Sequence, residues 1–208
     1  MPRKKTTIAT TKKLKKQKNI YEVDGIIYAV ENYYKFHLYL NEHKKYVDSF
    51  EIPTQRVKSK YGATKVKVNG IQFDSIAEAK YYVYLLKEKA TKKNIKEIKL
   101  QVPFILQEKI KKNGKTILPI KYIADFVVDY TNDTTRVIDI KGAVTVDFKL
   151  KRKMFEYRYL DYMLECINLY EDEWLHIEEI DKIKKQKKKE KAAEKSSKDT
   201  KSSGRRKK

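Results

Sequence analysis

The sequence predicts a mixed α/β domain, in the broad sense that includes α+β proteins, with a basic disordered tail at each end. Three observations support this: amphipathic helices, short apolar strands between them, and a net charge of +21 concentrated at the two ends of the 208-residue chain. A chain of this length has room for one ordinary domain plus extensions. The expected order is helix, strand, strand, strand, helix, strand, over residues 75–89, 97–106, 120–130, 136–141, 147–164 and 166–170.

The first helix is expected from Ser75 to about Lys89. Its apolar residues recur at helical spacing and form one stripe, which consists of Ile76, Ala79, Val83 and Leu86. Ser75 followed three residues later by Glu78 has the form of a capping box, a typical helix start.

The strands are separated by recognisable turn signals. Pro103 cannot donate a ladder hydrogen bond, so the strand 97–106 is expected to bulge or to lie at an edge of the sheet. The stretch KKNGK, residues 111–115, predicts a hairpin turn because Asn-Gly readily adopts the required backbone conformation.

The positive charge lies almost entirely in the tails. Residues 1–18 hold eight Lys and Arg and no acid, and residues 182–208 hold fourteen against three acids. The part between them is nearly neutral, at about +2. Basic arms bind polyanions by releasing counterions, so nucleic acid is the expected partner and an anionic membrane surface the second choice.

Several classes of protein are disfavoured by what the sequence lacks. Cys166 is the single cysteine, which leaves no disulfide framework and no CxxC zinc site. The three histidines have no ligand spacing, which disfavours a His-metal nuclease and a zinc hydrolase. There is no phosphate-binding loop, so no nucleotide cofactor is expected. No signal peptide or membrane-length apolar run is present, and a cytoplasmic protein without a membrane partner is therefore expected.

An internal similarity is visible before the main domain. Residues 23–40 align with residues 68–85 at a constant offset of 45. Each segment begins with a strand and a tight Asp-Gly or Asn-Gly turn and then enters a Tyr-rich helix. The second copy carries Glu78 where the first carries Tyr33. Chance similarity and duplication both remain open at this point.

Charged residues interrupt two apolar strands between Tyr122 and Gly142. Side chains in a strand alternate between its faces. Alternation places Asp125 with Ile123 and Val127 on one face, and Tyr122 on the other.

The hairpin between these strands brings the charges together. If its turn centres on residue 132 or 133, Asp125 lies opposite Asp139 or Lys141. Opposed Cβ atoms in antiparallel strands are roughly 5 Å apart. Two carboxylates and one ammonium group are therefore expected in a single patch.

A divalent cation would balance two adjacent carboxylates. Mg²⁺ prefers oxygen ligands and is typically held by one or two carboxylates plus a substrate phosphate, and Mn²⁺ is a possible substitute. The expected ligands are Asp125, Asp139 and the Ile140 carbonyl group. Lys141 would orient or deprotonate a water, or stabilise charge on the phosphate. This arrangement predicts hydrolysis of a phosphodiester.

The motifs SIAEAKYY, IADF and IDIKG resemble the three signature elements of the PD-(D/E)XK nuclease superfamily. Residues 66–170 resemble most an uncharacterised phage-encoded family in that superfamily, related to Holliday junction resolvases. Ala124 stands where the superfamily nominally has proline.

The resemblance implies a restriction-endonuclease-like core and a Mg²⁺-dependent DNA endonuclease. It implies that Glu78, Asp125 and Asp139 are metal or water ligands and that Lys141 is the catalytic lysine. Gln101 matches a polar position on the first strand of that family and is expected to contact DNA. Branched DNA as substrate, in phage replication or recombination, and a homodimer are also implied by the resemblance alone.

The expected domain organisation follows from these features. It comprises a basic disordered arm, a repeat-like strand-helix segment with a linker, a nuclease-like domain and a basic low-complexity tail, over residues 1–18, 19–57, 58–180 and 181–208.

Plainer interpretations remain open for several residues. Glu78 is either a ligand or only a helix cap. Asp139 and Lys141 form either a catalytic pair or an ordinary salt bridge. Lys149, Arg152 and Lys153 form either a DNA-contacting helix face or a solvated one. The alternative function is a non-catalytic basic nucleic-acid-binding protein.

Overall fold

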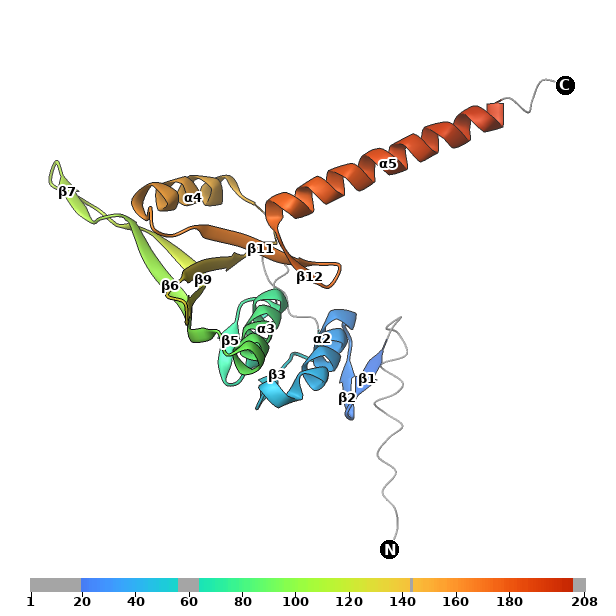
Figure 1. Ribbon diagram of the computed structural model, residues 1–208, viewed down its shortest axis with the longest axis horizontal. Helices are drawn as coiled ribbons and strands as arrows, with labels where there is room; N and C mark the ends of the chain where they lie inside the picture. Colours follow the sequence, from blue (N-terminus) through green and yellow to red (C-terminus); the bar gives the residue numbers. More distant parts are fainter. Residues whose placement is uncertain (1–19, 56–63, 143, 204–208) are drawn as a thin grey trace, which may run out of the picture. The chain divides into compact units, whose positions relative to one another are not determined.

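The computed structural model describes residues 20–55, 64–142 and 144–203 of the chain, and the surroundings of side chains as far as residue 192 (Figure 1). The expected arm at residues 1–18 lies outside the described residues. The chain forms two compact units, Met1–Asn94 and Ile95–Lys208, which are described separately below. Both contain helices and sheets, so the protein is of the mixed α and β class that the sequence predicts.

The first unit contains two copies of one hairpin-helix motif. Its elements are β1 (Tyr21–Val23), β2 (Ile26–Tyr28), α2 (Glu31–Glu42), the 3₁₀ helix η1 (Lys44–Tyr46), β3 (Phe50–Glu51), β4 (Val66–Val68), β5 (Ile71–Phe73) and α3 (Ile76–Lys92). The elements β4, β5 and α3 each begin 45 residues after β1, β2 and α2. The internal similarity in the sequence is therefore also a similarity in structure.

The two hairpins close with the same turn. Asp24 and Gly25 have φ values of 50° and 74°, and Asn69 and Gly70 have 52° and 76°. Positive φ at both central residues is the signature of a type I′ turn, which matches the twist of the flanking strands. The Asp-Gly and Asn-Gly pairs thus account for both hairpins.

The second copy packs with the first copy. Phe50 of β3 pairs with Val68 of β4. The Tyr39 hydroxyl on α2 donates to the carbonyl oxygen of Lys80 on α3 at 3.2 Å. The boundary between units consequently lies after Asn94, whereas the sequence suggested a boundary at residues 57/58. The difference arises because β3, which follows the first copy, pairs with β4 of the second copy and so joins the two copies into one unit.

The second unit is built on a five-stranded sheet of order β12-β11-β10-β9-β6. Its elements are β6 (Ile95–Gln107), β7 (Ile110–Lys112), β8 (Lys115–Ile117), β9 (Ile120–Tyr130), β10 (Thr135–Ile140), α4 (Val146–Arg158), β11 (Leu164–Tyr170), β12 (Glu173–His176) and α5 (Ile177–Ser203). The pair β10–β11 is parallel and is connected through α4, while the other pairs are antiparallel. Pro103 lies on the edge strand β6, as expected.

Two helices end at positions other than those expected. Helix α4 stops at Arg158 rather than near Leu164, because the next residue, Tyr159, turns into the core and its hydroxyl donates to the Ile105 carbonyl oxygen at 3.0 Å. The C-terminal segment, expected as a low-complexity tail, continues as α5 to Ser203. Its Lys, Glu, Ala and Gln residues have good helix propensity. No helix in the described part of the chain is long and apolar enough to span a membrane.

The core of the second unit lies between the sheet and α4. Tyr122 and Ala124 belong to the same buried cluster as Val127, and the Tyr122 ring lies 5.8 Å from that of Phe155 on α4. Strict alternation placed Tyr122 and Val127 on opposite faces of the strand, and that prediction is wrong. The change of face occurs between Ala124 and Val127, beside Gln101 of β6, whose φ of 51° also departs from regular extended backbone.

Candidate functional site

The charged patch lies where β9 and β10 pair. The register runs from Thr135 opposite Asp129 to Ile138 opposite Phe126, so the next residues in this register are Asp139 and Asp125. The Ile140 backbone N–H donates to Asp125 Oδ2 at 2.8 Å. The turn centre predicted at residue 132 is confirmed, and the two carboxylates belong to one site.

Asp139 is a buried carboxylate on the central strand, with a side chain only 1 % exposed. Lys141 Nζ lies 2.7 Å from its Oδ2, and the lysine side chain is 28 % exposed. The distance defines an ion pair, although its angles fall outside hydrogen-bond geometry. The attraction between the two charges does not depend on those angles.

Lys141 is a protonated side chain in this setting. Burial by itself lowers the pKa of its ammonium group, but the charges of Asp139 and Asp125 outweigh burial and leave the pKa raised. The ammonium group also lies 5.1 Å from the ring centre of Phe148 at the start of α4. Lys141 is therefore positioned as a fixed positive charge at the mouth of the site.

Two further buried groups surround Asp139. The Tyr122 hydroxyl is buried, and burial followed by the charge of Asp139 raises its pKa. The hydroxyl lies close enough to Asp139 to respond to its charge, but it makes no well-aligned hydrogen bond among the described residues. Cys166 lies beside Asp139 on β11 and is fully buried. Sequence reasoning missed Tyr122 because alternation placed it on the wrong face.

Asp125 is held in place by two donors. Besides the Ile140 N–H, the Gln101 side-chain amide donates to Asp125 Oδ1 at 3.2 Å. Gln101 lies opposite Asp125 on β6 and adopts a left-handed backbone conformation, which costs a non-glycine residue about 1–3 kcal/mol. Backbone strain of this kind persists only where the surrounding structure imposes it. Here the strained residue is the one whose side chain orients the Asp125 carboxylate.

The site suits a hard cation held by few protein groups. The buried Oδ2 atom of Asp139 has the Lys141 ammonium group as its charge partner, and Asp125 is oriented beside it. No cluster of three or more His, Cys, Asp or Glu side chains with metal-binding geometry exists within the described residues. Mg²⁺ tolerates such a site because water and phosphate oxygens complete its coordination. Asp125, Asp139 and the Ile140 carbonyl group thus remain the fitting ligands.

A cleft opens beside Lys141. Its volume is about 320 Å³, and its lining includes Lys121, Lys151 and the N-cap residue Thr145. The Thr145 hydroxyl accepts a hydrogen bond from the Phe148 N–H at 3.2 Å and so caps α4. Neither Asp125 nor Asp139 lines this cleft. The lining holds three lysines and one acid, Asp147, which pairs with Lys151 at 3.0 Å, so the cleft has an excess of positive charge next to the carboxylate pair.

Glu78 belongs to the first unit and, together with Ser75, caps the start of α3 there. Its Oε1 accepts from the Ser75 hydroxyl at 2.8 Å, and its Oε2 accepts from the Asp74 N–H at 3.3 Å. In return, the Glu78 N–H donates to Ser75 Oγ at 3.1 Å. The carboxylate has a structural role that explains its burial, and a ligand role for it stays a prediction.

The predicted DNA-contacting face of α4 is only partly free. Lys149 and Lys153 are exposed one helical turn apart. Arg152 instead forms ion pairs with Glu156 at 2.9 Å and with Glu178 on α5. Its guanidinium group ties two helices together, which reduces its availability for phosphate.

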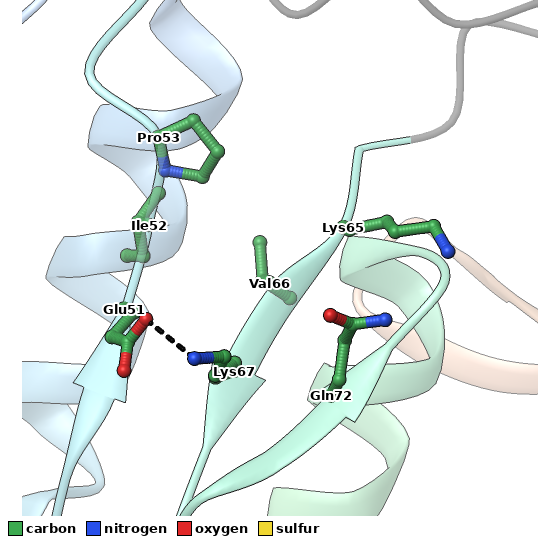
Figure 2. Close-up of a pocket in the computed structure, with 7 residues that line it drawn as sticks. All are labelled: Glu51, Ile52, Pro53, Lys65, Val66, Lys67 and Gln72. Atoms are coloured by element: carbon green, nitrogen blue, oxygen red, sulfur yellow. Dashed lines mark ion pairs between the residues drawn. The ribbon is translucent and has the colours of Figure 1, made fainter.

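A second hollow lies on the sheet of the first unit (Figure 2). Its volume is about 290 Å³, and it is floored by a row of polar side chains across β3, β4 and β5, namely Glu51, Lys67 and Gln72. Glu51 and Lys67 form an ion pair of 2.9 Å, drawn as a dashed line in Figure 2. Lys65, the third charged residue of the lining, pairs with Asp74 at 3.1 Å, so each charged group of the hollow already has a partner.

The chain belongs to a family described as "Protein of unknown function (DUF1064)", whose model matches residues 58–171. The matched range contains Glu78, Gln101, Asp125, Asp139 and Lys141. No curated protein and no solved structure matches the chain.

Proposed function

We propose that this protein is a metal-dependent DNA endonuclease with a core of the PD-(D/E)XK type. The order α3, β6, β9, β10, α4, β11 supports the proposal, because it is the order that the resemblance implies. The acidic residues occupy the corresponding second and third strands of that order, β9 and β10, and Lys141 follows Asp139 by two positions.

One observation carries the proposal. Asp139, a carboxylate on the central strand, is almost fully buried, and its charge partner is the Lys141 ammonium group, whose Nζ lies 2.7 Å from its Oδ2. Burial of a charged group costs several kcal/mol unless it is compensated. A second carboxylate from the adjoining strand lies beside it, which increases that cost. An arrangement that is unfavourable for stability is typical of a functional site.

The residues of the site divide the chemistry between them. Asp125 and Asp139 would hold Mg²⁺ or Mn²⁺, which supplies an activated water and stabilises negative charge on the phosphate. Ile140 fixes the orientation of Asp125 through its N–H. The raised pKa of Lys141 keeps its ammonium group charged at neutral pH, so we assign it stabilisation of the charge that develops on the phosphate rather than removal of a proton.

Branched DNA is the substrate class that we propose, and a homodimer is the corresponding assembly. Both rest on the resemblance to Holliday junction resolvases. Symmetric cleavage of a junction requires two sites related by a two-fold axis, which a homodimer supplies.

The test is cleavage of end-labelled four-way junction, flap and linear duplex DNA by the full chain, with Mg²⁺ or with EDTA. We expect cutting of the junction that depends on the metal and that exceeds cutting of the linear duplex. Equal cutting of all three would retain the nuclease and remove the preference for branches. Binding without cutting in any condition would contradict the proposed activity.

A non-catalytic nucleic-acid-binding protein is the second candidate. It is favoured by the run of exposed lysines on α5 between residues 182 and 191, which needs no acidic site. Under this alternative, Asp125→Ala leaves binding unchanged or tightens it, because the substitution removes a negative charge near phosphate. If Asp125→Ala instead abolishes cleavage and retains binding, the result favours the endonuclease.

A further inference from the structure

A fully exposed β-hairpin extends from the sheet of the second unit. It consists of β7 and β8, joined by a type I′ turn at Asn113 and Gly114, whose φ values are 52° and 74°. We call residues 109–118 the lysine hairpin. Every residue of both strands is exposed. In Figure 1 the hairpin lies at the end of β6 and β9 and projects past α4.

The hairpin carries concentrated positive charge. It contains four lysines and no acid, and among the described residues none of the four forms an ion pair: Lys109, Lys111, Lys112 and Lys115. The adjacent Glu108 is occupied by Arg158 at the end of α4, at 2.7 Å. The charge of the hairpin is therefore not balanced by its surroundings.

The arrangement of the lysines is unfavourable for the hairpin itself. Lys112 and Lys115 are cross-strand partners beside the turn. Like charges directly opposite each other destabilise a two-stranded ribbon, and an isolated ribbon is marginal in water in any case. A polyanion bound between the two ammonium groups would remove this repulsion, so the pair indicates a negatively charged partner.

The composition of the hairpin tip indicates which class of polyanion it fits, a lipid surface or a nucleic acid. The exposed apolar residues of the hairpin are Ile110, Ile117 and Leu118, and all three lie at the end away from the turn, where Ile110 and Ile117 face each other. The turn itself is Lys112, Asn113, Gly114 and Lys115, all polar or charged except the glycine. Insertion into a lipid layer requires apolar groups at the leading end. The polar tip instead suits entry into a groove lined with phosphates.

We propose that the lysine hairpin inserts into the major groove of duplex nucleic acid and acts as a second binding element. A two-stranded ribbon fits the major groove, which is about 12 Å wide in B-form DNA. The lysines would contact phosphates on both sides of the groove. The inference rests on the proposed function, since it assigns a duplex partner to the same protein.

The connection to the site sets the reach of the hairpin. Lys115 precedes Asp125 by ten positions along β8 and β9, which corresponds to at most about 33 Å of extended chain. One turn of B-form DNA is about 34 Å long. The hairpin therefore contacts duplex up to about one helical turn from the phosphodiester at the carboxylates.

The test is binding of fluorescein-labelled DNA to the full chain in EDTA, followed by anisotropy across a salt series. The variant carries Lys111→Gln, Lys112→Gln and Lys115→Gln. The matched control carries Lys44→Gln, Lys45→Gln and Lys87→Gln, three exposed lysines of the first unit. Both variants lose the same charge, and circular dichroism melting checks that each one folds.

We expect the hairpin variant to bind a duplex of about 20 base pairs at least tenfold more weakly, with a salt slope lower by about 2–3 because each lost phosphate contact contributes about 0.9. The effect should disappear on a duplex arm of about six base pairs, which is too short to reach the hairpin. An equal loss in the control, or an equal loss on single-stranded DNA, would overturn the proposal. So would unchanged duplex binding together with lost binding to anionic phosphatidylserine vesicles.

The outcome is separable from that of the proposed function. Binding is measured without metal and therefore does not depend on cleavage. If the wild type does not cut DNA but the hairpin variant loses duplex affinity, the proposal for the hairpin stands and the proposed nuclease activity does not. If the hairpin variant binds and cuts DNA like the wild type, the nuclease activity stands and the proposal for the hairpin does not.

Discussion

Asp139 is almost fully buried on the central strand, where the Lys141 ammonium group lies 2.7 Å from its Oδ2 and Cys166 lies beside it on β11. The burial of Asp139 and the orientation of Asp125 by Gln101 can each be tested on a single residue.

Cys166 tests the burial of this site. Burial raises the pKa of the Cys166 thiol to about 12, so the reactive thiolate is scarce at pH 8. We expect Ellman's reagent to leave the native protein unmodified and to react with one thiol per chain after unfolding in guanidinium chloride. Rapid reaction of the native protein would show that the core beside Asp139 is open.

Gln101 tests the backbone strain. Glycine in a strand is normally less stable than alanine, but it adopts a positive φ without steric cost. We therefore expect Gln101→Gly to be more stable than Gln101→Ala by about 1 kcal/mol, and both variants lose the amide donated to Asp125. Urea unfolding of the two variants measures the difference. The usual order, with alanine more stable, would contradict the left-handed assignment.

At the residue scale, the sequence located the carboxylates but not all of their surroundings. The alternation of charged and apolar residues and the short polar turn after Tyr130 were enough to place Asp125 and Asp139 together. The face on which Tyr122 lies was not predictable, because strict alternation fails beside Gln101. Glutamine carries no sequence signal for a positive φ, unlike the Asn-Gly pairs of the turns.

At the scale of elements, local signals predicted most helices and strands. Asp-Gly and Asn-Gly marked the turns, and the capping box at Ser75 marked the start of α3. The end of α4 was missed because it depends on the long-range contact between Tyr159 and Ile105. The length of helix α5 was underestimated, because a lysine-rich segment is also typical of a low-complexity tail.

The capping box of α3 makes a prediction for Glu78. Glutamine can make the same reach-back contact at this position. We expect Glu78→Gln to unfold at nearly the wild-type urea concentration, whereas Ser75→Ala loses about 1 kcal/mol of stability because it removes the cap. An equal loss in both variants would argue against the cap. Cleavage measured on the stable Glu78→Gln variant then reports on any ligand role separately from folding.

At the scale of the whole molecule, the charge distribution was readable from the sequence and the division into units was not. The sequence contains the repeat, but the pairing of β3 with β4 decides that both copies belong to one unit. The first copy has Tyr33 where the second has Glu78, and Tyr33 is likewise buried, with its hydroxyl bonded to Thr64 at 2.9 Å. The first copy therefore has a structural role at this position.

The central claim is that the carboxylate pair on β9 and β10 makes this protein a metal-dependent nuclease. The most direct test is nicking of supercoiled plasmid DNA in Mg²⁺ by wild type, Asp139→Asn and the matched control Asp129→Asn. Asp129 lies on the same hairpin but is bonded to Lys99 and Thr135 away from the site. We predict that wild type and Asp129→Asn nick the plasmid and that Asp139→Asn is at least about 100-fold slower, the scale expected when charge stabilisation is lost. Nicking by Asp139→Asn at the wild-type rate would contradict the account.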